Sequence, residues 1–229
     1  MLNIYSIKNY PYILLFFLTF NAFSQNTLIG IGESALSLNH KVSKKYNVNF
    51  AFRSRYFLYN INELQYKQQQ LDVFHFSTYN INSKHKLSLG AYYRNRAFFE
   101  TGSDELRFME QFSASKKINK IRLRHRFRAE QRILETKTIF RQRYRFAVDL
   151  PLVGNTLDIG EPFLMSALEG LWSLKEVSAP EIDSRTTIFI GWQLAKTLKF
   201  QTGLEHRFEA LNISAKNYLF LLTSAILKI

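Results

Sequence analysis

Arginine occupies every second position in two neighbouring segments between Ile121 and Phe146, and these side chains carry the clearest chemistry of the sequence. The first segment holds Arg122, Arg124, Arg126 and Arg128, and the second holds Arg141, Arg143 and Arg145. A guanidinium group is always charged and matches carboxylate and phosphate groups bidentately. A row of such groups therefore indicates either that the protein binds an anion or that it pairs carboxylates of its own chain.

The spacing of these arginines identifies the elements that position them. In a strand, successive side chains point to opposite faces, whereas on a helix the same spacing would scatter the charges around the axis. Leu123, His125 and Phe127 alternate with the arginines of the first segment, so one face is cationic and the other is largely apolar. A similar alternation recurs in residues 46–58, 86–99, 184–194 and 200–210.

Eleven candidate strands can be traced in this way, and each is near the ~9–11 residues that cross a bilayer when tilted. The sequence therefore predicts an all-β fold, an antiparallel transmembrane β-barrel of about 10–12 strands with short periplasmic turns and longer outer loops. Single-chain bacterial barrels use even strand numbers. Either the first segment, residues 28–39, lies outside the wall, or a further strand lies within residues 153–161.

Closure of the sheet decides which face points inward. In hydrocarbon every backbone polar group must be satisfied, so strands cross a membrane in a closed sheet whose apolar face meets lipid. An arginine facing the bilayer midplane costs about 2–4 kcal/mol, so we expect the arginine face to line the lumen and to pair there with carboxylates in an ionic lattice. The candidate lumen-lining residues are Arg53, Arg55, Arg94, Arg96, Arg122, Arg124, Arg126, Arg128, Glu130, Arg141, Arg143, Arg145, Glu205 and Arg207.

These arginines allow three interpretations. They fill and stiffen a narrow lumen, or they form a channel or binding site for small anionic solutes, because arginine attracts phosphate and carboxylate groups. Alternatively, the chain is a soluble periplasmic β-protein whose basic face binds acidic polymers, in keeping with its formal net charge of +13 at pH 7. Export and the lack of aromatic residues interleaved with that basic face argue against nucleic acid as a partner.

The first residues read as a secretory signal. Lys8 precedes an apolar run from Tyr12 to Phe20, and small residues follow at Ala22 and Ser24. We expect residues 1–24 to be removed and residues 25–229 to form the barrel domain; the alternative is an uncleaved anchor, although the run is shorter than the ~20 residues of a spanning helix. The chain contains no cysteine, so neither disulfides nor a lipid-modified cysteine are available.

No catalytic, metal or cofactor motif stands out, and the sequence predicts a protein without enzymatic activity. The histidines are not paired at the spacing of metal ligands. One alternative is an outer-membrane lipid-modifying or lipolytic enzyme, because some barrels carry a serine and a histidine on the lipid-facing wall. His125 and His206 have the parity of that wall, but no serine can be assigned to either from the sequence.

Short motifs along the chain resemble a known family. "LRHRFRAEQR" at residues 123–132 precedes "RQRYRF" at 141–146 and Pro151, with "FRSR" at 52–55 and "EPFL" at 161–164. In these segments the chain resembles the domain of unknown function 2490 family, whose members are bacterial proteins with a signal peptide and an outer-membrane barrel. The resemblance implies fold and outer-membrane location, with outer-membrane lipid as the surrounding partner, and it implies no activity.

Overall fold

The computed structural model describes residues 28–175 and 178–229, which form one closed β-barrel. The predicted signal segment, residues 1–24, lies outside the described residues. A short 3-10 helix, η2 (Ala97–Phe99), interrupts the connection between β4 and β5. The strands are β1 (Ile29–Lys41), β2 (Tyr46–Asn60), β3 (Glu63–Asn80), β4 (His85–Asn95), β5 (Glu105–Ile118), β6 (Ile121–Leu134), β7 (Thr138–Pro151), β8 (Pro162–Lys175), β9 (Ser178–Gln193), β10 (Leu198–Glu209) and β11 (Lys216–Lys228).

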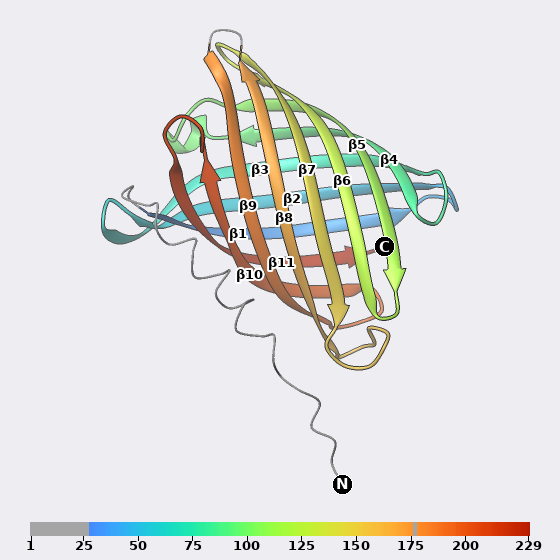
Figure 1. The fold of residues 1–229 in the computed structure, drawn as a ribbon. Helices are drawn as coiled ribbons and strands as arrows, with labels where there is room; N and C mark the ends of the chain where they lie inside the picture. The colour runs from blue at the N-terminus through green and yellow to red at the C-terminus, as the bar shows by residue number, and fades with distance from the viewer. Residues whose placement is uncertain (1–27, 176–177) are drawn as a thin grey trace, which may run out of the picture.

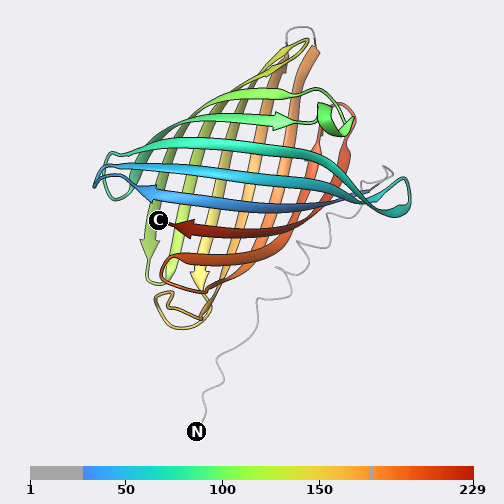
Figure 2. The ribbon, with the colours of Figure 1, turned by 180° about the vertical axis from the view of Figure 1, so that it is seen from behind.

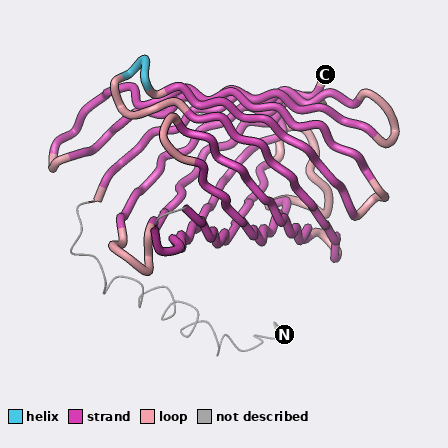
Figure 3. Tube along the Cα trace, turned by 90° about the horizontal axis from the view of Figure 1, so that it is seen from above, coloured by secondary structure: helices cyan, strands magenta, loops and turns pink. Residues whose placement is uncertain are grey.

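Each strand from β1 to β11 pairs with the next in antiparallel register, and the barrel closes where β1 meets β11 in parallel. The strands of the two walls cross at a steep angle, with β6–β9 in front of β1–β4 (Figure 1), and the same crossing is visible from behind (Figure 2). Seen from above, strands make up almost the entire wall (Figure 3). The predicted all-β barrel is therefore confirmed.

The strand number corrects the expectation of an even count. The structure has eleven strands, because residues 28–39 do not lie outside the wall and residues 153–161 do not add a strand. The first segment is held on both sides: Glu33 pairs with Leu222 of β11 and with Arg55 of β2. Parallel pairing makes this possible, since only a parallel closing pair can join the edges of an odd number of alternating strands.

The hairpin of β2 and β3 is longer than the sequence indicated. The polar composition of residues 59–69 predicts a loop. In the structure, however, β2 continues to Asn60 and β3 begins at Glu63. Ile61 and Asn62 turn the chain with φ values of 52° and 62°, and a two-residue turn with two positive φ angles matches the twist of paired strands. Leu64 is 87% exposed, so this hairpin projects beyond the wall (Figure 2).

Alternation along the strands separates an apolar outer wall from a mixed interior. In β8, Met165 and Leu171 are buried and point inward, whereas Leu168 and Trp172 are 59% and 46% exposed on the outer face. The other strands repeat this pattern. A closed sheet with an apolar outer face satisfies all its backbone hydrogen bonds and presents hydrocarbon to lipid, so the barrel is built to span a bilayer.

The connections define two rims. One rim, the C-terminal rim, carries residues 42–45, 81–84, 119–120, 152–161 and 194–197 together with Ile229, and the opposite rim carries 61–62, 96–104, 135–137 and 210–215. Lysine is concentrated at the C-terminal rim, for example at Lys44, Lys45, Lys84 and Lys120. No helix among the described residues has the length and hydropathy needed to cross a membrane.

Part of the interior is filled by an apolar cluster. Ile31, Ala147, Phe163, Met165, Ala167, Phe189, Phe220 and Leu222 pack together inside the barrel. These residues come from β1, β7, β8, β9 and β11, so one side of the lumen is sealed by hydrocarbon. Charged side chains of these and the other strands line the rest of the lumen.

The connection 96–104 is held by one carboxylate. Asp104 accepts hydrogen bonds from Tyr93 Oη (2.5 Å), from the amide nitrogens of Arg96 (2.8 Å) and Ala97 (2.9 Å), and from the Asn95 side chain (3.1 Å). The hydrogen bond from Tyr93, followed by those from the two amides, lowers the pKa of Asp104 below its ordinary value. The loop is thus fixed most firmly when this group is ionised.

We expect the order of this loop to depend on pH. Because the folded-state pKa of Asp104 is depressed, the stabilisation is complete above the ordinary carboxyl pKa of ~3.9 and is lost as the pH falls through the folded-state value. Amide hydrogen exchange should show protection at Ala97 that falls in acid, and Asp104→Asn should reduce it at neutral pH. Glu100→Gln, an exposed change in the same loop, should leave protection unchanged; an equal loss there would contradict the assignment.

Candidate functional site

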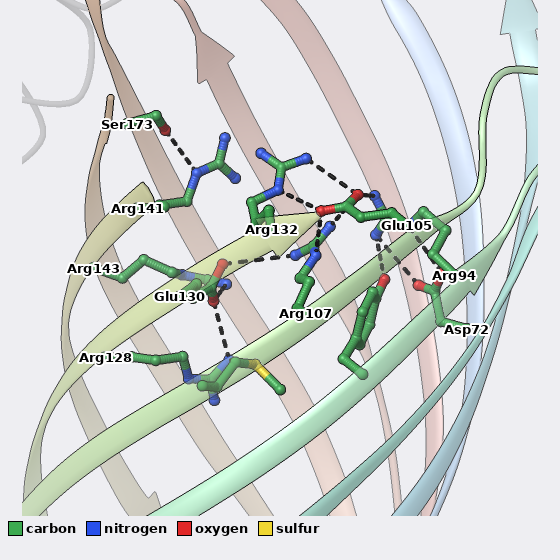
Figure 4. A network of polar contacts seen from close by, with 12 residues as sticks. Asp72, Arg94, Glu105, Arg107, Arg128, Glu130, Arg132, Arg141, Arg143 and Ser173 are labelled. Carbon is green, nitrogen blue, oxygen red and sulfur yellow. Dashed lines mark hydrogen bonds and ion pairs between the residues drawn. The ribbon is translucent and has the colours of Figure 1, made fainter. Parts of the chain in front are cut away.

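An almost continuous chain of ion pairs runs around the lumen, and we call it the ionic belt. Its centre is shown in Figure 4, where Asp72, Arg94, Glu105 and Arg107 link β3, β4 and β5. Arg94 lies 2.9 Å from Asp72 and 3.6 Å from Glu105, and Arg107 lies 2.6 Å from Glu105. The same Arg107 reaches Glu130 of β6 at 3.7 Å. Each acidic group therefore connects arginines of neighbouring strands.

The belt continues through β7, β8 and β9. Arg143 lies between two carboxylates, 2.7 Å from Glu130 and 2.7 Å from Glu169. Arg185 then lies 4.0 Å from Glu169 and 3.9 Å from Glu209 of β10. Because Arg143 bridges β6 and β8 from the strand between them, it joins the two halves of this wall.

On the other side the belt reaches β1 and returns to β10. Arg53 lies 4.0 Å from Asp72 and 3.2 Å from Glu33. Glu33 also accepts a hydrogen bond from Arg55 Nε at 2.6 Å and lies 4.0 Å from Arg207. Arg207 in turn pairs with Glu205 at 2.5 Å. The two ends of the belt thus meet on β10, and every strand from β1 to β10 contributes a charged group.

Aromatic rings add cation–π contacts to arginines of the belt. The Arg107 guanidinium lies 4.4 Å from the centre of the Tyr92 ring, and the Arg207 guanidinium lies 3.7 Å from the Phe220 ring of β11. Phe74 and Phe76 of β3 lie inside the barrel. The Arg53 guanidinium lies 5.2 Å from the centre of the Phe74 ring, and the Arg128 guanidinium lies 4.9 Å from the centre of the Phe76 ring. Such cation–π contacts partly replace the hydration that these cations lose.

The carboxylates of the belt are almost completely withdrawn from solvent. Asp72 and Glu105 are each 1% exposed and Glu130 is 3% exposed. Removing a carboxylate from water costs several kcal/mol, and good pairing geometry is needed to offset that cost. The belt supplies it, since Glu105 also accepts hydrogen bonds from both Arg107 and Arg132. The arrangement is stable only while the charges of both signs remain present.

The predicted lumen-lining residues surround two cavities. A central cavity of about 580 Å³ is bordered by Arg53, Arg55, Arg94, Arg96, Arg126, Arg128, Glu130, Arg141, Arg143, Arg145, Glu205 and Arg207. A second cavity of about 520 Å³, which we call the vestibule, lies toward the C-terminal rim and is bordered by Arg122, Arg124, Arg126 and Arg145. Arg126, Arg145 and Met165 border both cavities and mark the junction between them.

The vestibule differs from the central cavity in its charge balance. Its cationic side chains are Lys84, Lys86, Arg122, Arg124, Arg126, Arg145 and Lys199. Among the described residues that border it, Asp149 is the single carboxylate, and Arg122 and Arg124 share it at 3.1 and 2.7 Å. Arg126 pairs with Glu169 at 2.8 Å. The vestibule therefore keeps an excess of positive charge.

Several belt residues were not singled out from the sequence. Asp72, Glu105 and Arg107 sit in strands where aromatic residues share the inward face or where a carboxylate also appears on the outward face. Glu110, for example, lies on the outer wall although Glu105 points inward. In β5, Glu105 and Arg107 alternate with the apolar Leu106 and Phe108, so strict alternation predicts that both charged side chains point inward.

The outer-wall histidines named from the sequence do not meet a serine. His125 Nδ1 lies 2.8 Å from Tyr144 Oη, and the His206 ring packs edge-on against Phe208 at 4.3 Å. Within the described residues, no group of histidines and carboxylates is arranged to hold a metal ion. The lipolytic alternative therefore finds no support at these two positions.

Comparisons with known proteins were made on the sequence and on the fold. The structure of LpxR from Salmonella typhimurium is similar, with a TM-score of 0.49 and 10% sequence identity over 80% of this chain and 83% of that one. No curated protein matches the chain. The expectation that this chain has no enzymatic activity is corrected on this comparison, which leaves an enzymatic role open; at 10% identity no activity or residue role is transferred to this chain.

The family model gives the firmer assignment. The model described as "Protein of unknown function (DUF2490)" matches residues 34–217, which run from β1 into β11 and include the whole of the ionic belt except Glu33. This match confirms the resemblance seen in the arginine-rich segments. The chain is a β-barrel protein that belongs to the DUF2490 family.

Proposed function

We propose that this barrel binds small anionic solutes in the vestibule and admits them to a narrow passage through the lumen. The observation that supports this is the unbalanced charge of the vestibule. Lys84, Lys86, Arg145 and Lys199 border it and take part in no ion pair among the residues that the structure describes. The Nη2 atom of Arg145 lies 3.9 Å from the sulfur of Met165.

The contrast with the ionic belt gives the vestibule its role. In the belt, arginines are paired and contribute to cohesion of the wall. In the vestibule, like charges line a partly enclosed space, where low-dielectric walls strengthen the field and raise the local anion concentration. Guanidinium and ammonium groups bind phosphate and carboxylate oxygens well. A cavity of about 520 Å³ accommodates a compact solute of this class.

The junction between the two cavities sets the selectivity of the passage. A solute leaving the vestibule meets Arg126 and Arg145 beside Met165, and these three border both cavities. Rings of arginine favour anions and oppose cations in narrow pores. Beyond the junction the solute would have to compete with the carboxylates of the belt, so a slow and selective passage is expected.

A structural role is the second candidate, and the closed belt favours it. A lumen whose charges are nearly all paired stiffens the wall without transporting anything. The two roles differ at the vestibule, because a purely structural lumen gains nothing from an unpaired cluster of cations.

Conductance in planar bilayers separates these roles. We expect purified protein to give small, reproducible steps with a chloride permeability above that of potassium. The double variant Lys84→Glu/Lys86→Glu places carboxylates in the vestibule and should abolish or reverse the anion preference. Inorganic pyrophosphate should raise the thermal unfolding temperature of the wild type and not of this variant.

The matched control uses the neighbouring turn at the same rim. Lys44→Glu/Lys45→Glu makes the same charge change on exposed residues that border neither cavity, and it should leave the permeability ratio unchanged. An equal loss in both variants would assign the effect to surface charge. Electrically silent protein that pyrophosphate does not stabilise would contradict the proposal and leave the structural role.

A further inference from the structure

A serine and a histidine lie side by side on the outer wall of β3. His75 Nε2 is 3.0 Å from Ser77 Oγ. The two residues are two apart in a strand and so share a face. Their neighbours Phe74 and Phe76 border the central cavity, so His75 and Ser77 point outward toward lipid. We propose that they form a nucleophile and general base that cleave the acyl esters of membrane lipids.

Hydrogen bonding around Ser77 suits this assignment. Tyr46 Oη donates a hydrogen bond to Ser77 Oγ at 2.9 Å. Since Ser77 Oγ accepts the hydrogen bond from Tyr46, we assign its own hydroxyl hydrogen to His75 Nε2, in the tautomer in which that nitrogen accepts. The Phe50 ring lies 4.4 Å from the His75 ring and holds it in this orientation. A serine bonded to a neighbouring base at about 3 Å is the arrangement from which hydroxyl nucleophiles are activated.

The position of the pair along the wall places it at the level of lipid ester groups. Tyr46 and Tyr79 pair across β2 and β3 next to Ser77, on the side of the C-terminal rim, and both are exposed on the outer face. Tyrosine is enriched where barrels meet the headgroup region. Ser77 is the outward-facing residue of β3 next to Tyr79 and lies one step closer to the middle of the membrane. This is the level at which acyl esters join the headgroup to the hydrocarbon.

An apolar hollow continues from the pair toward the middle of the wall. Leu36, Phe52, Leu71 and Val73 border this hollow of about 380 Å³ on the outer face. Phe52 and Val73 pair with each other, directly beyond the pair formed by Phe50 and His75. A lipid whose ester carbonyl lies at Ser77 can therefore lay its acyl chain along this hollow.

The reaction follows in two steps that balance in atoms and charge. Ser77 Oγ attacks the ester carbonyl carbon while its proton passes to His75 Nε2. The intermediate expels the glycerol oxygen, which takes the proton from His75, and the acyl group remains on Ser77. Water then attacks the acyl carbon with His75 as the base, which releases the fatty acid and restores the serine.

The test measures fatty acid release from phosphatidylethanolamine in mixed micelles by the folded full-length barrel. Ser77→Ala and His75→Asn should each lower the rate by about 100-fold or more, the usual contribution of such groups. A fluorophosphonate probe should label the wild type at Ser77, as shown by peptide mass, and should not label Ser77→Ala. Boiling-dependent gel mobility confirms that each variant keeps the closed barrel.

Two controls change the same residue types elsewhere on the outer wall. Ser166→Ala on β8 and His125→Ala on β6 lie outside the proposed site and should retain the wild-type rate. Release that persists in Ser77→Ala, or a folded wild type that neither releases fatty acid nor reacts with the probe, would overturn the proposal. These outcomes are independent of the vestibule, because Ser77 and His75 border neither internal cavity.

Discussion

Replacing Glu130 with glutamine is expected to lower the free energy of unfolding by about 3–5 kcal/mol, the cost of breaking a buried ion pair by removing one partner. Glu130 is 3% exposed and lies within 2.7 Å of Arg143, 3.5 Å of Arg128 and 3.7 Å of Arg107. Glutamine keeps the shape but removes the charge. Three buried guanidinium groups would then repel one another without the carboxylate that now lies between them.

Urea unfolding in detergent micelles, followed by tryptophan fluorescence, measures this loss. Glu135→Gln removes the same charge from an exposed turn and should change the free energy of unfolding by less than ~0.5 kcal/mol. In the double variant with Arg143→Gln, the cost should be clearly less than the sum of the single costs, because the repulsion is also reduced. Additive effects would show that Glu130 is not the common partner of these arginines.

Replacing Gly203 with alanine is the second large effect that we expect. A Cβ at this position of β10 would lie 2.0 Å from the backbone oxygen of Ile188 and 2.9 Å from the Cα of Phe189. Both contacts are with the backbone of β9, which cannot move without breaking its ladder. Overpacking of this kind costs about 1–3 kcal/mol or more, so the variant should unfold at lower urea.

Gly170 provides the matched comparison on β8. A Cβ added there meets no atom within 4 Å, so Gly170→Ala should leave the free energy of unfolding unchanged or raise it by up to about 1 kcal/mol, because alanine restricts the unfolded chain. Similar destabilisation by both alanines would mean that loss of glycine flexibility, rather than close packing of β9 and β10, causes the effect.

The fold class followed from alternation, because a period of two over many short segments admits few structures other than a sheet. The eleven candidate strands traced by alternation match the structure, but the expectation of an even count was wrong, since the pairing partner of β1 is almost the whole chain away. No local pattern in residues 28–39 shows that they close against β11 in parallel. The length of the β2–β3 hairpin did not follow from alternation either, because Gln68 and Gln69 are polar strand residues and resemble a loop.

The candidate site was accessible from the sequence only in part. The arginines of β6 and β7 stood out by number and parity together with Glu130, but their other partners, Asp149 and Glu169, did not. Glu169 is the lone charge in the apolar residues 163–174, and it lies beside Arg126 and Arg143 only once β6, β7 and β8 pair in this register. The pair formed by His75 and Ser77 was hidden in a strand of mixed parity, where inward-facing Phe74 and Phe76 obscure which face meets lipid.

The parallel contact between β1 and β11 has a topological consequence. Both strands run toward the C-terminal rim, so the wall begins with Ile29 at one rim and ends with Lys228 at the other. Hairpins alone cannot complete such a wall, because one strand is always left over. Until β1 and β11 pair with each other, both edges of the sheet therefore remain open to pairing with a wrong neighbour.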